Sequence, residues 1–270
     1  MEQFLFWRII VITKIQMIMS NAWDLKVDDS RTSDSLYTFV IFCEDEISEY
    51  HYFKWFETEL IKVNIIRKQK SMLTNVKKAI TYCAENGILM YDGAKYSTEN
   101  NGIEIWCVYD RDIERNLSEI AENNNEFNLS IELASQNSIN VAWSNDAFEL
   151  WILLHIMEVD HNIEESKKRT YYYDNLTEYF RNKQNPNVDL IKVLSHASYS
   201  YKKDLKSKDN FINIVRSEIL PHTNTAIERS KSLVETHQST VNFYEKKPCT
   251  LVHNLVIKLL EKGGKEIPLN

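Results

Sequence analysis

Glycine and proline are scarce in this sequence, with five Gly and four Pro in 270 residues. Turn-rich all-β folds and long flexible linkers depend on these residues, so their scarcity argues against both. The sequence also has no internal repeat and no low-complexity tract. Hydrophobic residues make up 43% of the chain and charged residues 26%. This balance is typical of a globular protein with a buried core.

Cysteine is also sparse, and the four cysteines form no CxxC pair: Cys43, Cys83, Cys107 and Cys249. Their spacing does not fit a zinc site, and nothing in the sequence requires an oxidising compartment. We expect them to be core thiols. The sequence contains no Walker loop, GxSxG elbow or HExxH motif, so it gives no support to an ATPase, an α/β-hydrolase or a zincin.

No apolar run is long enough to span a bilayer. The first nineteen residues are apolar, but Arg8 and Lys14 interrupt them, and a basic start and a small-residue cleavage site are missing. Met17 and Met19 are alternative start positions. We expect residues 1–36 to be an N-terminal extension of unassigned structure, and the protein to be cytoplasmic with no membrane association.

Strand and helix patterns alternate from residue 37 onward, which predicts an α/β fold. The continuous apolar run from Tyr37 to Cys43 is typical of a central strand of a parallel sheet. Further strands are predicted at 61–66, 103–109 and 139–143, and helices at 48–60, 71–86 (with Ser71 as N-cap) and 114–137. This alternation predicts a mostly parallel sheet flanked by helices.

The pattern becomes helical from Asp146 onward and ends in a helix predicted at 250–262. We therefore predict an α/β core over residues 37–157. A helical C-terminal region, residues 158–270, is predicted to pack on this core.

Acidic residues cluster at the ends of two predicted strands. Glu44 follows the first strand with Glu49 one turn later, and Asp110 and Asp112 follow the third. Working residues of open α/β sheets gather at the carboxyl ends of the strands. Mg²⁺ requires only one or two carboxylates and keeps several waters. A Mg²⁺ (or Mn²⁺) site is one interpretation; acids that cap the following helices are the other.

The net charge of −7 does not suggest a general nucleic-acid coat protein. The charge is uneven, because residues 162–208 hold ten Lys and Arg against six acids. An acidic metal pocket beside a basic, Tyr-rich surface would suit a phosphodiester substrate. A solvated helical face is the alternative, which composition alone favours.

Several polar residues fit structural roles as well as they fit a site. Asp146 and Glu149 have the D-x-x-E spacing of a helix capping box, so Glu149 fits a cap and a site equally. His155 lies on an apolar stripe, which favours a buried, hydrogen-bonded histidine. Lys202 can contact a phosphate or be a solvated lysine. The tyrosines at 171–173 can stack on bases or pack between helices.

Three segments match the sequence pattern of a known family. FCEDEISEYHYF (residues 42–53) resembles a strand followed by C-E-G-x-x-T-E-x-x-Y-F, and WCVYDRD (106–112) resembles W-x-V-F-D-R-D. AWSNDAFELWILLH (142–155) resembles S-N-P-x-F-E-L-W-L-L-L-H. In these segments the chain resembles the RloB family, whose members are linked to restriction systems and phage defence. With weaker matches further on, the resemblance covers residues 37–260. The chain departs from the pattern at Asp45, where the family has Gly.

The resemblance implies a Toprim-like fold whose acidic core is related to topoisomerases, primases and OLD-type nucleases. It implies that Glu44 is a general acid/base or metal ligand and that Asp110 and Asp112 hold Mg²⁺ or Mn²⁺. It implies that Glu49 and Glu149 are supporting acids, with Glu49 as a further metal ligand. We add Lys202 as a candidate catalytic lysine.

Two functions follow as hypotheses. The first is a divalent-metal-dependent nuclease in antiphage defence that cuts RNA (tRNA included) or DNA. The second is a non-catalytic, Toprim-shaped sensor or scaffold that binds nucleic acid or a phage protein. A primase-like enzyme would need a nucleotide site that the sequence does not show. We expect a nucleic-acid substrate and a defence-system partner protein; the sequence does not give the oligomeric state.

Overall fold

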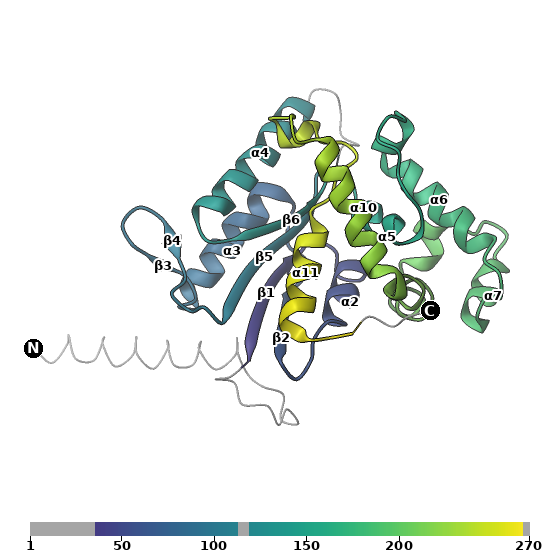
Figure 1. Cartoon of the computed structure of the whole chain (residues 1–270), viewed down its shortest axis with the longest axis horizontal. Helices are drawn as coiled ribbons and strands as arrows, with labels where there is room; N and C mark the ends of the chain where they lie inside the picture. The colour runs from purple at the N-terminus through teal and green to yellow at the C-terminus, as the bar shows by residue number, and fades with distance from the viewer. Residues whose placement is uncertain (1–35, 113–118, 267–270) are drawn as a thin grey trace, which may run out of the picture.

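The central sheet has four parallel strands in the order β2-β1-β5-β6 (Figure 1). The computed structural model describes residues 36–112 and 119–266. The strands are β1 (Tyr37–Cys43), β2 (Ile61–Ile66), β5 (Ile103–Asp110) and β6 (Asn140–Ser144). The predicted strands are therefore confirmed, with shifts of one residue at the ends of β5 and β6.

Strand β1 is apolar throughout because both of its faces are buried. Phe39, Ile41 and Cys43 belong to one hydrophobic cluster, and Val40 and Phe42 belong to the other. All five side chains are at most 2% exposed. A strand between two parallel neighbours, with helices on both sides, requires this continuous apolar run.

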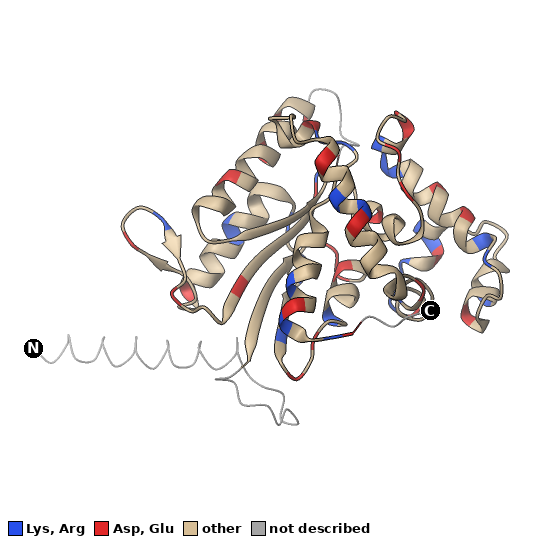
Figure 2. Ribbon diagram, viewed as in Figure 1, with Lys and Arg blue, Asp and Glu red and all other residues tan. Residues whose placement is uncertain are grey.

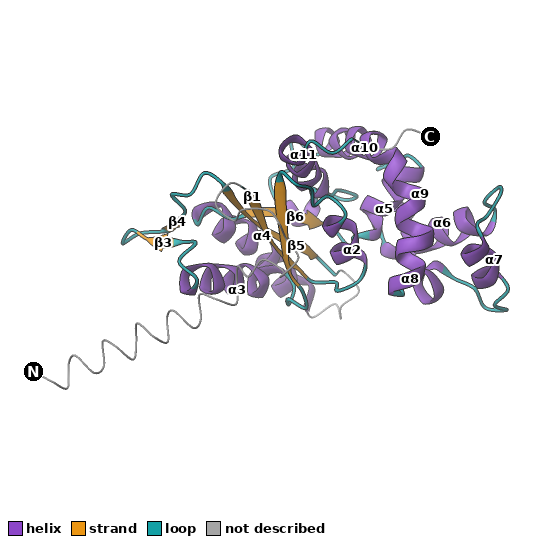
Figure 3. Ribbon diagram, turned by 90° about the horizontal axis from the view of Figure 1, so that it is seen from below, coloured by secondary structure: helices purple, strands orange, loops and turns teal. Residues whose placement is uncertain are grey.

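Helices cover the two faces of the sheet in separate layers (Figure 3). The cluster around Val40 includes side chains of α3 (Met72–Glu85) and α4 (Ile120–Gln136). The other cluster includes, with side chains of later helices, those of α2 (Ser48–Lys54), α5 (Glu149–Ile156), α10 (Thr223–Thr236) and α11 (Val252–Gly263). The result is an α/β sandwich in which helices from both ends of the described chain pack on one sheet.

One predicted helix differs from the structure, one is described only in part, and one hairpin was not predicted. Helix α2 ends at Lys54 rather than at residue 60, because the Glu57 carboxylate accepts the Val63 amide at 2.9 Å and turns the chain back into β2. The helix expected over 114–137 is described only from Ile120, because residues 113–118 lie outside the described part. The short hairpin β3 (Met90–Tyr91) and β4 (Tyr96–Ser97) was not predicted.

The chain after β6 is mainly helical, as predicted. Between α5 and α10 lie the α-helices α6 (Arg169–Arg181), α7 (Val188–Leu194), α8 (Lys208–Asn210) and α9 (Ser217–Ile219). Two segments are π-helical, η4 (Tyr201–Leu205) and η5 (Phe211–Arg216). Three short turns are 3₁₀-helical: η3 (Glu165–Lys167), η6 (Leu220–His222) and η7 (Phe243–Glu245). The chain then returns to the sheet, where the Leu251 amide donates to the Trp143 carbonyl at 2.9 Å. The predicted fold class, a parallel sheet flanked by helices with a helical C-terminal part, is confirmed.

All four cysteines are buried free thiols, as expected. Among the helices of the described residues, none has the length and apolarity needed to cross a membrane.

Candidate acidic site at the carboxyl edge of the sheet

Acidic side chains follow three neighbouring strands of the sheet at the same edge. Glu44 follows β1, Asp110 ends β5, and Asp146 follows β6. The parallel register places Cys43 beside Val108 and Asp110 beside Ser144, so the loops that carry these acids are adjacent. The acids therefore lie together at the carboxyl ends of the strands, where functional residues of open α/β sheets are expected.

The inner acids of this edge are Glu44, Glu49 and Asp110. The Asp110 amide donates to Glu44 Oε2 at 3.4 Å, and the Asp45 amide donates to Glu49 Oε2 at 3.0 Å. Ser71 Oγ donates to the Asp110 carbonyl oxygen at 2.6 Å. Ser71 stands at the N-cap position of α3, as predicted, but its side chain holds the end of β5 and makes no capping hydrogen bond. Asp110 Oδ1 is buried without a hydrogen-bond partner.

The inner acids raise one another's pKa. Burial and then the charges of Asp110, Asp45 and Glu44 raise the pKa of Glu49 well above its usual range. The hydrogen bond from the Asp45 amide acts in the opposite direction, but its effect is smaller. Burial, followed by the charges of Glu44, Glu149 and Asp112, does the same to the pKa of Asp110.

The pKa of Glu44 is also raised, first by burial and then by Asp112. No Lys, Arg or His within residues 36–112 and 119–266 forms an ion pair with an inner acid. These carboxyls therefore retain protons more readily than ordinary ones, or require an external cation.

Arg169 joins the loops after β5 and β6. Its Nε donates to Asp146 Oδ1 at 3.0 Å, and one Nη donates to the Asp146 carbonyl oxygen at 2.6 Å. The same Nη donates to Asp112 Oδ1. The Arg169 amide also donates to Asp146, at the start of α6. One guanidinium fork thus holds two acids on different loops, a geometry that lysine cannot reproduce.

Lys206 joins the loop after β1 to the start of α5. Its Nζ lies 2.7 Å from Glu149 Oε1 and 3.6 Å from Asp45 Oδ2. The Glu149 side chain is only 2% exposed, whereas that of Lys206 is 27% exposed. Helix α5 has no side-chain cap, so the capping-box interpretation of Asp146 and Glu149 is wrong. Both residues instead pair with cations of the helical C-terminal region.

Asp45 stands where the resemblance predicts Gly, and its loop does not need glycine. The positive-φ non-glycine residues of the described chain do not include Asp45. Its Oδ1 accepts hydrogen bonds from the Ile47 amide and, at 3.0 Å, from the Ser48 amide. Asp45 therefore supplies acceptors for the first amides of α2, as a helix cap does. The departure from the family pattern adds a cap and leaves the acids in place.

Backbone strain is concentrated at this edge. Asp112 has a φ of 52° and Asp146 a φ of 108°, in loops that follow β5 and β6. Lys68 and Met72, after β2, also have positive φ. Such conformations cost energy for residues with a Cβ and are commonest where the surrounding structure serves a site. Arg169 bonds to both strained aspartates and so holds these loops in place.

Arg111 anchors the loop after β5 through buried hydrogen bonds. It is 2% exposed, and its Nη1 donates to Asn145 Oδ1 at 2.9 Å and to the Tyr244 carbonyl oxygen at 2.8 Å. Asn145 Nδ2 donates in turn to the Lys246 carbonyl oxygen at 2.6 Å. Burial lowers the pKa of Arg111 to about 10. This buried network ties the acidic edge to the segment before α11.

The remaining predicted residues lie in different places. Lys202 is exposed, and its Nζ lies 5.3 Å from the centroid of the Tyr173 ring. The lysine that contacts the acids is Lys206, four residues later. His155 is buried and bonded to Tyr52 Oη at 3.2 Å and to the Trp151 carbonyl oxygen at 2.8 Å. Its structural interpretation is confirmed, and burial lowers its pKa to about 3.

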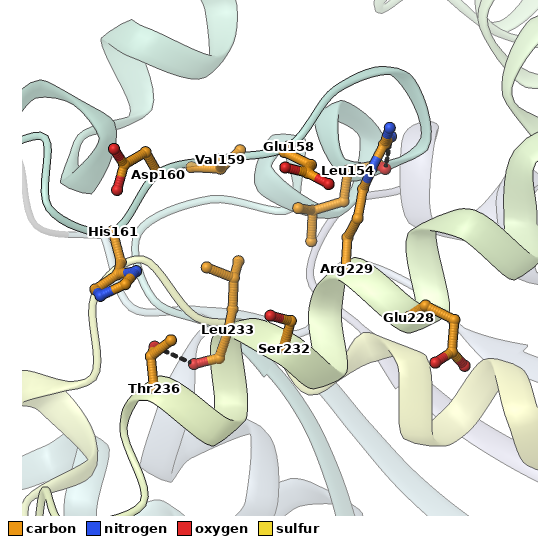
Figure 4. Close-up of a pocket in the computed structure, with 10 residues that line it drawn as sticks. All are labelled: Leu154, Glu158, Val159, Asp160, His161, Glu228, Arg229, Ser232, Leu233 and Thr236. Atoms are coloured by element: carbon orange, nitrogen blue, oxygen red, sulfur yellow. Dashed lines mark hydrogen bonds between the residues drawn. The ribbon is translucent and has the colours of Figure 1, made fainter.

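A pocket of about 560 Å³ lies between α10 and the loop that follows α5 (Figure 4). Leu154, Val159 and Leu233 line it together with charged residues that include Glu158 and Arg229. Arg229 Nη1 donates to the Leu154 carbonyl oxygen at 2.8 Å. None of its lining residues belongs to the acidic edge, so this pocket is not part of the candidate site.

The inner acids suit a divalent cation in their chemistry. In the part of the chain that the structure describes, no three or more His, Cys, Asp or Glu side chains form a ready metal-binding group. Mg²⁺ requires fewer carboxylates, because water supplies the remaining ligands. Asp110 Oδ1 is a buried oxygen without a partner, and Glu44 shares its surroundings. Asp112 and Glu149, by contrast, are already paired with Arg169 and Lys206.

The comparisons with known proteins agree with the segments quoted above. A family model described as RloB-like protein matches residues 39–259. No curated protein and no solved structure matches the chain. The match runs from within β1 to within α11 and so includes every acid of the site. The chain therefore belongs to the RloB-like protein family.

Proposed function

We propose that the chain is a divalent-metal-dependent nuclease that acts in antiphage defence. One observation carries the proposal: the inner acids Glu44, Glu49 and Asp110 lie at the carboxyl edge without an ion-pair partner among the described residues, while Arg169 and Lys206 hold the acids around them. A phosphodiester needs this combination of metal-binding carboxylates and fixed positive groups. The family resemblance supports the defence context.

Each residue has a chemical task in this proposal. Glu44 and Asp110 would hold Mg²⁺ or Mn²⁺, which neutralises phosphate charge and lowers the pKa of bound water. Glu49, whose pKa burial and neighbouring acids raise, would be the proton donor. The acids Asp146 and Glu149 hold the side chains of Arg169 and Lys206 in place. Other N–H groups of the same two side chains would bind phosphate oxygens.

A second function is favoured by one feature of the site. Asp112 and Glu149, both expected as working acids, are paired with cations in the structure. Such pairing suits a sensor or scaffold that binds nucleic acid or a phage protein without cutting it. The two functions differ in one outcome, because the scaffold binds its partner and leaves it intact.

The test is cleavage of labelled tRNA, single-stranded RNA and plasmid DNA with Mg²⁺, Mn²⁺ or EDTA. Wild type is compared with Asp110→Asn and Glu44→Gln, which keep side-chain size and remove a charge. Glu132→Gln is the matched control, because Glu132 is exposed on α4. We expect metal-dependent cleavage that both site variants lose by at least about 100-fold and that the control retains.

Metal binding by calorimetry gives a readout that does not depend on turnover. Mn²⁺ should bind wild type and Glu132→Gln, and bind Asp110→Asn much more weakly. Cleavage that survives in Asp110→Asn with Glu44→Gln would refute the catalytic role of these acids. Nucleic-acid binding without cleavage would support the scaffold instead.

A further inference from the structure

Positive charge gathers beside α2, next to the acidic edge. Arg216 Nη1 donates to the His51 carbonyl oxygen at 3.0 Å. Arg216 belongs to η5, which packs against α2 and directly follows α8, where Lys208 stands. Arg67 lies over the ring of Tyr50 in α2. These three cations therefore border α2.

Arg67 and Lys208 are exposed, and within the described residues neither forms an ion pair. Elsewhere on the helices, acidic and basic residues are interspersed (Figure 2). Several lysines there pair with a glutamate three residues away, as Lys231 does with Glu228. The cations beside α2 thus form a local positive surface on an acidic protein.

Two partly buried tyrosines stand at this surface, each beside a cation. The Arg67 guanidinium lies 4.6 Å from the centroid of the Tyr50 ring. The Nζ atoms of Lys202 and Lys206 lie 5.3 and 5.8 Å from the centroid of the Tyr173 ring. Single-stranded nucleic acids are bound by this pairing, because the ring stacks on a base and the cation takes a phosphate.

Both tyrosine–cation pairs adjoin residues of the acidic edge. Tyr50 directly follows Glu49 in α2, and Lys206 contacts both Tyr173 and Asp45. A strand that contacts both tyrosines would therefore lie beside the acidic edge.

We propose that this surface is a binding track for a single-stranded polynucleotide. The track consists of Tyr50, Arg67, Lys208, Tyr173 and Lys202. The proposal rests on the proposed nuclease function, in which the acidic edge binds a phosphate of the same strand. A duplex keeps its bases stacked inside and cannot offer them to Tyr50 and Tyr173. The proposal thus narrows the substrate class from nucleic acids in general to single strands.

The test is binding without turnover. Fluorescence anisotropy in EDTA compares a labelled 12-nucleotide RNA, the same sequence as DNA, and the matching duplexes. The variants are Tyr50→Ala, Tyr173→Ala and Lys208→Ala; the matched controls are Tyr91→Ala and Lys77→Ala, exposed residues on β3 and α3. Tyr173→Phe retains the ring and should bind as wild type does.

We expect the single strands to bind more tightly than the duplexes and each tyrosine-to-alanine change in the track to weaken binding by about fivefold or more. Lys208→Ala should reduce the slope of log K against log salt by about 0.7, the value for one single-strand phosphate contact. The control variants should match wild type in both measurements. The RNA and DNA arms then show which sugar is preferred.

Duplex binding as tight as single-strand binding, or track variants that bind as wild type does, would overturn the track. Cleavage is measured on the same proteins with Mg²⁺, so the two proposals fail separately. Wild type that cleaves while the track variants bind normally refutes the track alone. Wild type that binds single strands through the track and cleaves none refutes the nuclease alone.

Discussion

Lys206 and Glu149 form an ion pair of 2.7 Å that joins the helical C-terminal region to the acidic edge. Lys206 directly follows the π-helical segment Tyr201–Leu205, a rare turn that is often found at functional sites. Burial lowers the pKa of Lys206, but the charges of Glu149 and Tyr173 outweigh burial, and the net pKa is raised. Lys206 therefore stays charged through the neutral range.

Removing Lys206 should destabilise the fold. Lys206→Met leaves the Glu149 carboxylate buried and unpaired, so we expect the free energy of unfolding to fall by roughly 3 kcal/mol. The double variant Lys206→Met/Glu149→Gln should recover most of this loss. Urea denaturation measures both, with Lys202→Met as the exposed control that changes by less than about 0.5 kcal/mol. Equal stability of the two lysine variants would contradict the assigned pair.

Arg169→Lys should reduce cleavage even though the charge is kept. A lysine cannot hold Asp112, Asp146 Oδ1 and the Asp146 carbonyl oxygen together, so both strained loops lose their common partner. We expect kcat/KM to fall by at least about tenfold.

The matched control is Arg181→Lys on the same helix, where the arginine forms an exposed pair with Glu178. Circular dichroism verifies that both variants are folded. If Arg169→Lys cleaves as wild type does, the guanidinium fork is not required.

The sheet and the inner acids were predictable from the sequence for a physical reason. A strand buried on both faces must be continuously apolar, as Tyr37–Cys43 is, and parallel strands end at a common edge. Glu44 and Asp110 could therefore be placed together before any contact was known. The Ser71 hydrogen bond could not be predicted, because it joins residues 39 positions apart that no sequence spacing connects.

The cations of the site were harder to predict. Arg169 and Lys206 are far in sequence from the acids that they bind, and no spacing connects them. Lys202 and Lys206 are four residues apart, so an α-helix would present them on one face. Both approach the Tyr173 ring, but only Lys206 reaches Glu149 from the end of the π-helical turn. Such a turn leaves no mark in the apolar pattern that was used for the prediction.

Asp45→Gly, which restores the residue expected from the family, should weaken the fold slightly. The change removes the acceptor of the Ile47 and Ser48 amides and one contact of Lys206. Replacing such a cap by glycine costs only about 0.3–0.5 kcal/mol. We expect a melting temperature lower by about 1–2 °C, with cleavage retained. Asp45→Asn, which keeps an acceptor oxygen, is the control. Loss of cleavage in Asp45→Gly alone would give Asp45 a role beyond capping.

Asp110→Asn should stabilise the metal-free protein at high pH. Burial and then neighbouring acids raise the folded-state pKa of Asp110 above its unfolded value of about 3.9. The native state then binds the proton more tightly, so the carboxyl lowers the free energy of unfolding as pH rises from the unfolded pKa through the folded pKa. Asparagine does not titrate and escapes this loss.

In EDTA we therefore expect Asp110→Asn to melt close to wild type near pH 4 and about 2–4 °C above it at pH 8. Mg²⁺ should raise the melting temperature of wild type at pH 8 and leave that of Asp110→Asn nearly unchanged, because the variant lacks the oxygen charge that the cation neutralises. Asp174→Asn, at an exposed position of α6, controls for the change in the unfolded chain. A difference between Asp110→Asn and wild type that is the same at both pH values would show that Asp110 has an ordinary pKa, and the inner acids would then not repel one another.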